Sequence, residues 1–344
     1  MAISGALNAL KSSKLISWKP CGRVQQTLKR RVEASGTTLH SGKSSTVRLL
    51  PELAGKGRYF YFNSKSIPAS IDYAQESPLC TTLSNDGVKI RTVEHLLSAL
   101  EAMSVDNCRI EITNLDSDDS DLDSEVPVLD GSARDWVERI EKDGLVAAKD
   151  ECGNDCEKLA PYLNEPIHVS KNDSFVAAFP SPKVRVSYGI DFPQVAIGSQ
   201  WFSLAPLEDS LYAKEIAPSR TFCIYEEVEH MRKAGLIKGG SLDNAIVCSA
   251  SKGWLNPPLR FSDEPCRHKI LDLVGDLSLF ARFGNQGLPV AHIVVYKVIY
   301  DLWAWTQMLH LCLMHKFTCI SFFVHGCMYL YAYIYTRLKL VELT

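Results

Sequence analysis

The feature that most constrains this 344-residue chain is a pattern of strands and amphipathic helices that occurs in each half. In the first half, alternating runs at 45–50 and 108–112 predict strands, and apolar spacing at 92–103 and 133–142 predicts helices. In the second half we expect strands at 166–168, 174–179, 184–190 and 290–296, and helices at 225–233 and 267–283. This repetition predicts an α+β fold of two similar domains, each a small sheet with paired helices, packed as a β-α-α-β sandwich.

The length of the chain allows two domains, because single domains usually contain about 100 to 200 residues. The polar segment 151–163, which contains Cys152 and Cys156, is the best candidate for a linker. The sequence therefore predicts a first domain over residues 25–150 and a second domain over residues 164–297.

Residues 1–24 have the composition of a leader. Lys and Arg recur up to Arg31, and the first acidic residue is Glu33. A basic, Ser-containing start without acidic residues is typical of a mitochondrial transit peptide, which predicts a mitochondrial location. A disordered basic tail is the alternative interpretation.

Residues 298–344 differ from the rest of the chain, because they are strongly apolar and rich in Trp, Tyr, Phe and Cys. The segment 317–336 has no formal charge over about twenty residues, which is long enough to cross a bilayer. Membrane contact through this divergent tail is one interpretation, although His325 interrupts the segment and its aromatic residues are not confined to the ends. Translation beyond a normal coding junction, for example into a retained intron, is the other.

Composition argues against one class of partner and indicates the redox environment. The formal net charge of -3 gives no field strong enough to attract nucleic acid. The 11 cysteines are scattered, which favours free thiols in a reducing compartment. One acidic stretch lacks the spacing of a calcium loop and is interpreted as a solvated surface loop; it contains Asp116, Asp118, Asp119, Asp121, Asp123 and Glu125.

Two short pairs carry the residue types of a metal site. Glu94 and His95 are adjacent on one predicted helix. His268 and Asp272 lie four apart on another, so they share a helical face. Two histidines and one carboxylate are a common ligand set for catalytic zinc, with a fourth position left for water. Taken alone, such pairs are more often found on an ordinary helix surface.

Five motifs support a more specific interpretation. They are 91–96 (RTVEHL), 125–133 (EVPVLDGSA), 219–222 (SRTF), 239–247 (GGSLDNAIV) and 267–272 (RHKILD). In order and spacing the chain resembles the UDP-3-O-acyl-N-acetylglucosamine deacetylases of lipid A biosynthesis, from about Gln26 to Lys297. The resemblance implies a zinc-dependent hydrolase that releases acetate from the acetamide of a UDP-3-O-acyl-N-acetylglucosamine.

The resemblance also implies a role for each matched residue of the centre. His95, His268 and Asp272 would hold the zinc ion, although iron could occupy the same ligands. Glu94 would take a proton from the attacking water, whose acidity the metal raises. Thr221 would stabilise the oxyanion that develops on the acetamide carbonyl.

Four further residues would contact the substrate. Lys269 would meet the nucleotide sugar, Phe222 would lie beside the sugar, and Tyr188 would stack on uracil. Leu39 belongs to a segment that resembles a family loop near the acyl chain. An exposed lysine and two core aromatic residues are the alternative for the first three.

The resemblance ends after Lys297. In the family a Gly-His motif follows, whose histidine acts as an acid toward the departing amine, and an aspartate matching Asp276 supports it. Here the sequence continues with 298–303 (VIYDLW), so Asp276 would lack this partner. Loss of a positioned general acid costs about 10²- to 10⁴-fold in rate, which predicts a chain that binds zinc but deacetylates poorly.

Three functions remain open at this point. The first is deacetylation of UDP-3-O-acyl-N-acetylglucosamine by a plant mitochondrial form of the enzyme, which we expect to be a monomer. The second is binding of the same nucleotide lipid without catalysis, and the third is zinc-dependent hydrolysis of another substrate.

Overall fold

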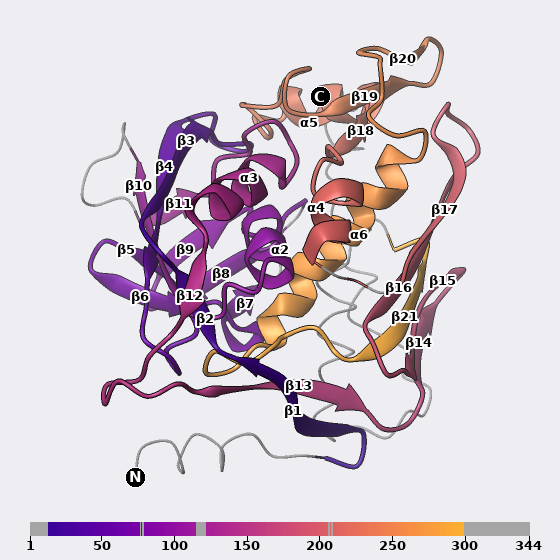
Figure 1. Ribbon diagram of the computed structural model, residues 1–344. Helices are drawn as coiled ribbons and strands as arrows, with labels where there is room; N and C mark the ends of the chain where they lie inside the picture. The colour runs from indigo at the N-terminus through magenta and orange to yellow at the C-terminus, as the bar shows by residue number, and fades with distance from the viewer. Residues whose placement is uncertain are drawn as a thin grey trace.

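The computed structural model describes residues 13–75, 77, 79–114, 122–205, 207 and 209–298. Within these ranges each half of the chain forms one five-stranded sheet (Figure 1). In spatial order the first sheet contains β3 (Val32–Thr37), β4 (Ser44–Pro51), β10 (Cys108–Asn114), β5 (Arg58–Phe62) and β6 (Lys65–Pro68). The second contains β14 (Ile167–Lys171), β15 (Ser174–Pro180), β21 (Ala291–Tyr296), β16 (Arg185–Phe192) and β17 (Gly198–Leu204).

The two sheets share one strand order. In each, the strand that comes last in the chain occupies the centre, antiparallel to one neighbour and parallel to the other. Thus β10 lies between β4 and β5, and β21 lies between β15 and β16. The repeated sequence pattern corresponds to a repeated topology, and the predicted α+β content is confirmed. The exact domain boundaries stay a prediction.

Helices α2 (Glu94–Ala102) and α6 (Glu264–Leu277) lie side by side between the two sheets (Figure 1). Nearly every residue of α2 is buried, including Leu96, Leu97 and Leu100, because it packs in the interior rather than on a surface. The other helices among the described residues are α3 (Arg134–Asp143), α4 (Asp209–Glu215), α5 (Tyr225–Lys233) and the 3-10 turns η1 (Ile71–Tyr73) and η2 (Ser278–Phe280).

Smaller sheets connect these layers. One contains β11 (Asp123–Glu125), β9 (Val88–Arg91), β8 (Thr82–Asn85) and β7 (Ala74–Gln75). Another contains β18 (Phe222–Ile224), β19 (Ile246–Ser249) and β20 (Gly253–Trp254). Two ribbons pair β1 (Ile16–Val24) with β13 (Glu157–Leu163) and β2 (Gln26–Leu28) with β12 (Leu145–Ala147).

The ribbon of β1 and β13 contains residues on both sides of the predicted first domain. Its antiparallel pairing joins residues 16–24 to residues 157–163. Lys158 makes the segment look polar, but its side chain is buried and forms an ion pair, with Nζ 2.5 Å from Asp106 Oδ1. The predicted linker 151–163 thus includes strand β13, and the predicted leader 1–24 includes strand β1.

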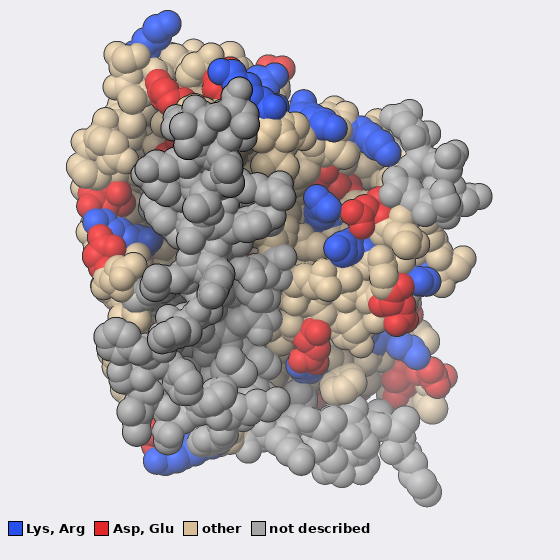
Figure 2. Space-filling model, turned by 180° about the vertical axis from the view of Figure 1, so that it is seen from behind, with Lys and Arg blue, Asp and Glu red and all other residues tan. Residues whose placement is uncertain are grey.

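The described surface carries a mixture of charges. Figure 2 shows acidic and basic side chains interspersed over the part of the rear face that is not drawn in grey. No helix within the described ranges is long and apolar enough to span a membrane. The tail segment 299–344, with the span predicted at 317–336, lies outside the described residues, as does 115–121 of the acidic stretch.

Candidate metal centre and active-site pocket

Helix α6 presents three functional residues on one side. His268, Asp272 and Asp276 follow one another at intervals of four, so their side chains lie along a single face. Pro265 is in the first turn of the helix, where a missing backbone N–H costs nothing. The rest of the helix is mostly buried, which brings this face into the interior.

Helix α2 supplies Glu94 and His95 from its first turn. Gly275 in the last turn of α6 allows the two helices to meet, because a Cβ at that position would lie 2.1 Å from the Glu94 backbone oxygen. A glycine inside a helix costs about 1 kcal/mol relative to alanine. Here it permits the close contact that places Glu94 and His95 beside the functional face of α6.

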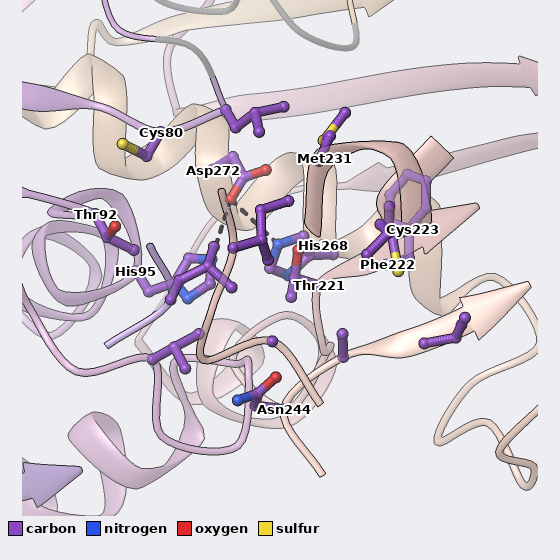
Figure 3. Close-up of a pocket in the computed structure, with 18 of the residues that line it drawn as sticks. Cys80, Thr92, His95, Thr221, Phe222, Cys223, Met231, Asn244, His268 and Asp272 are labelled. Carbon is purple, nitrogen blue, oxygen red and sulfur yellow. Dashed lines mark ion pairs between the residues drawn. The ribbon is translucent and has the colours of Figure 1, made fainter. Parts of the chain in front are cut away.

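The ligand atoms of His95, His268 and Asp272 all lie within 4.8 Å of one another. Asp272 Oδ1 lies 3.5 Å from His95 Nε2 and 3.3 Å from His268 Nε2 (Figure 3). Zinc bonds of about 2.0–2.1 Å at tetrahedral angles separate ligand atoms by about 3.3 Å. Asp272 Oδ1 is buried and has no hydrogen-bond partner within the described residues. These three residues therefore fit a zinc ion.

A backbone carbonyl orients His268 within this cluster. The Nδ1–H of His268 donates to the Ser219 oxygen at 2.9 Å, which leaves Nε2 facing Asp272. Glu264, fully buried at the start of α6, accepts hydrogen bonds of 2.9 Å from the backbone N and from Nε of Arg220. Glu264 thereby holds the segment that carries the Ser219 carbonyl.

Burial and mutual charge set the protonation of the cluster. Burial lowers the pKa of His268 to about 4, although Asp272 opposes the shift. Burial also favours neutral His95, but the Asp272 carboxylate outweighs it and the pKa of His95 is raised. Burial alone would raise the pKa of Asp272, yet His268, Lys269 and His95 hold it well below its ordinary value. An ionised carboxylate and a neutral His268 are the states that bind a cation.

Two further carboxyl groups, Glu94 and Asp276, are joined through Thr81. The Thr81 backbone N–H donates to Glu94 Oε2 at 3.1 Å, and its hydroxyl donates to Asp276 Oδ1 at 2.6 Å. Burial raises the pKa of Glu94 well above its ordinary value and raises the pKa of Asp276 to about 7. Both groups can therefore gain or lose protons nearer neutral pH than an exposed carboxyl group.

A cavity of about 250 Å³ opens beside these residues. Thr221, Phe222 and Lys269 line it near the candidate metal ligands, and Thr221 lies next to His268 in Figure 3. Lys269 Nζ is 2.9 Å from Asp272 Oδ2 and 5.7 Å from the centre of the Phe222 ring. The apolar part of the lining includes Leu39, Phe192, Ile224, Val228, Met231 and Ile237. The cavity thus offers polar, ionisable groups together with an apolar wall.

Comparison with known proteins identifies the family. The family model for LpxC, the UDP-3-O-acyl N-acetylglycosamine deacetylase, matches residues 25–302. The chain belongs to this deacetylase family. The family predicted from the five motifs is confirmed.

Relatives of this deacetylase family occur in plants and cyanobacteria. Five Arabidopsis thaliana proteins, named probable mitochondrial UDP-3-O-acyl-N-acetylglucosamine deacetylases 1 to 5, are each 64% identical over 287 residues, or 83% of this chain and 87% of the relative. The UDP-3-O-acyl-N-acetylglucosamine deacetylase of Trichormus variabilis is 48% identical over 286 residues, or 81% of this chain and 95% of the relative. That of Thermosynechococcus vestitus is 45% identical over 283 residues, or 81% and 91%.

Every site residue predicted from the sequence of this deacetylase-family chain lines the cavity, except Tyr188. Tyr188 is fully buried on β16, and its hydroxyl donates to the Val298 oxygen at 2.5 Å. Side chains of a strand alternate between two faces, and that of Tyr188 lies in the core. The prediction that Tyr188 stacks on uracil is therefore wrong, and its alternative as a core aromatic holds.

Sequence reasoning missed two residues that build the site. Thr81 bonds to Glu94 and Asp276, which lie 13 and 195 residues away, so no local pattern reveals it. Gly275 offered a usable signal, because a glycine inside a strongly predicted helix often marks close packing.

Proposed function

We propose that this chain catalyses zinc-dependent hydrolysis of the acetamide of UDP-3-O-acyl-N-acetylglucosamine, releasing acetate. The observation that carries the proposal is the position of Asp272 Oδ1, which is buried without a hydrogen bond among the described residues and lies between two histidine nitrogens in a cavity that Glu94 also lines. The names of the relatives supply the substrate. The cavity's apolar wall suits an acyl chain.

The ligands would be His95, His268 and Asp272, and zinc bound there would polarise the acetamide carbonyl and acidify water. Glu94 lies next to His95 in the sequence and would accept the proton of the attacking water. The Thr221 hydroxyl would donate to the oxygen on which negative charge develops. The backbone N–H of Thr221 donates to the Gly131 oxygen at 2.7 Å, and this hydrogen bond holds the residue in place.

The reaction breaks the C–N bond of the acetamide and yields acetate and a free amine, which must receive a proton. Glu94 would return the proton it gained. Asp276 would support this transfer through Thr81, which donates to both carboxyl groups. Lys269 would face the anionic nucleotide sugar, and Phe222 would contact the sugar ring.

We propose that the reaction belongs to lipid A biosynthesis, as the resemblance of the five motifs implies. We also propose a mitochondrial location, which the mitochondrial names of the plant relatives support. The two similar sheet-and-helix halves would act as its two domains, with the pocket residues drawn from both.

Acetate release from UDP-3-O-acyl-N-acetylglucosamine by the zinc-loaded full-length chain tests the proposal. We expect Glu94→Gln to lower kcat by about 10²- to 10⁴-fold while zinc affinity is preserved, because Glu94 is a proton acceptor and not a ligand. If the parent chain binds the nucleotide lipid but releases no acetate, it is a non-catalytic binder. If it binds neither the lipid nor UDP, the proposed substrate is wrong.

A further inference from the structure

Glu125 is a buried carboxylate that no step of the proposed reaction uses. It ends β11, opposite Arg91 of β9, and only 4% of its surface is exposed. The interpretation of the acidic stretch as a solvated loop is therefore wrong for Glu125. Because a charged side chain is rarely buried without partners, its contacts indicate what it does.

Three hydrogen-bond donors meet this carboxylate. The backbone N–H of His40 donates to Oε1 at 2.9 Å and to Oε2 at 3.2 Å, and the N–H of Ser41 donates to Oε2 at 3.2 Å. The hydroxyl of Thr92 donates to Oε1 at 2.9 Å. One side chain thus joins the segment 38–42 to the residue two positions before Glu94.

The segment 38–42, which we call the Leu39 loop, also contacts the second half of the chain. The N–H of Lys238 donates to the His40 oxygen at 3.2 Å, and that of Gly239 donates to the Leu39 oxygen at 3.0 Å. Gly239 permits this approach, because a Cβ there would lie 2.0 Å from a backbone oxygen of the loop. Since Leu39 lines the cavity, the loop closes part of its wall.

Thr92 holds a backbone conformation that β-branched residues rarely adopt, with φ of 57°. Strain of this kind costs on the order of 1–3 kcal/mol and persists only where surrounding contacts determine it. The hydrogen bond to Glu125 is one such contact. It fixes the turn from which Glu94 and His95 enter α2.

We infer that Glu125 is a positioning residue that couples the Leu39 wall of the cavity to the Glu94–His95 pair. Glu125 itself does not line the cavity, so it acts through the loop and through Thr92. The part of the inference that concerns the substrate rests on the proposed function. The Leu39 wall would determine how the acyl chain fits, and Glu125 would hold the Leu39 wall in position. The coupling of loop and helix start does not depend on the substrate.

Hydrogen–deuterium exchange of the full-length chain tests the coupling. Glu125→Gln keeps the shape of the side chain but replaces one acceptor oxygen by an NH₂ group, so exchange in residues 38–43 should become faster. Glu101→Gln is the matched control, because buried Glu101 accepts hydrogen bonds from the backbone N–H groups of Gly287 and Leu288. It should accelerate exchange at residues 286–289 and leave 38–43 unchanged. No change at 38–43 in Glu125→Gln, or an equal change in both variants, would overturn the inference.

Calorimetric binding to the metal-free chain tests the consequence for the ligand, with UDP and a UDP-3-O-acyl-glucosamine as probes. We expect Glu125→Gln to weaken binding of the acylated probe about tenfold, the size expected from loss of about one hydrogen bond, and to leave UDP binding unchanged. Glu101→Gln should change neither. Equal weakening of both probes, or of neither, contradicts a role in acyl fit. Failure of the parent to bind the acylated probe counts against the proposed function, and exchange still decides the coupling.

Two variants of Thr92 test the second part of the coupling, which is the contact between Glu125 and the start of α2. Thr92→Val replaces the hydroxyl by a methyl group and should lower kcat while affinity for the acylated probe is retained. Thr92→Ser should restore the rate because it keeps the hydrogen bond to Glu125. Equal rates for the Val and Ser variants would show that the hydroxyl does not position the start of α2.

Discussion

Helices α2 and α6 contribute to the same centre in different ways. Helix α6 carries His268, Asp272 and Asp276 within its length, where the helical turn fixes their spacing. Helix α2 carries Glu94 and His95 in its first turn, immediately after a strained segment. The geometry of the first group is local, whereas that of the second depends on residues distant in the sequence.

This difference indicates where the centre is sensitive to substitution. The start of α2 is held by Thr81, Thr92 with Glu125, and Gly275, which come from separate segments. Changes on the face of α6 should remove one function at a time. Changes in the contacts of α2 should displace Glu94 and His95 together.

The largest effect is expected from Asp272→Asn, which removes the only carboxylate among the three proposed zinc ligands. Loss of a residue that only supports a metal ligand lowers metal affinity by up to about 100-fold. Loss of the ligand itself should lower zinc affinity by more than that. Competition with a chromophoric chelator measures it. Asp209→Asn, on the exposed first turn of α4, should leave the affinity unchanged. Parent-like zinc binding by Asp272→Asn would refute this ligand set.

Gly275→Ala breaks the contact between the two helices. Alanine would favour an isolated helix by about 1 kcal/mol, but its Cβ would lie 2.1 Å from the Glu94 oxygen, and overpacking costs about 1–3 kcal/mol. We expect a lower melting temperature together with weaker zinc binding. A more stable variant with unchanged zinc affinity would show that α2 does not need this close approach.

An effect visible only in the pH dependence of stability is expected from Asp276→Asn in the metal-free chain. Burial raises the pKa of Asp276 from 3.8 to about 7, so between these values the folded state holds a proton that the unfolded state has released. The free energy of unfolding therefore falls as pH rises from about 4 to about 7. Asn keeps the acceptor for Thr81 without the charge, and above pH 7 it should stabilise the fold by up to about 4 kcal/mol.

Thermal unfolding at a series of pH values measures this prediction. The two melting curves should converge near pH 4 and separate toward pH 8. Parallel curves for the parent and Asp276→Asn would mean that Asp276 titrates as an exposed carboxyl group does.

Part of the centre could be predicted from the sequence. The interval of four between His268 and Asp272 is a local property of a helix, and the strands expected at 108–112 and 290–296 became the central strands of the two sheets. Tyr188 could not be placed, because the aromatic side chain fits a core and a binding site equally well. Glu125 was misjudged, because burial of a charge depends on partners elsewhere in the chain.

The sequence by itself determined the family, through the order and spacing of five motifs, and the α+β pattern, through two periodicities of apolar residues. Tertiary structure alone decided that His95 meets Asp272 and that Thr81 joins two carboxyl groups. It also decided that one buried glutamate holds both a cavity wall and the start of α2. The physical reason is range: periodicity records which face of one element is buried, whereas a hydrogen bond or a close helix contact requires two distant segments to be in place.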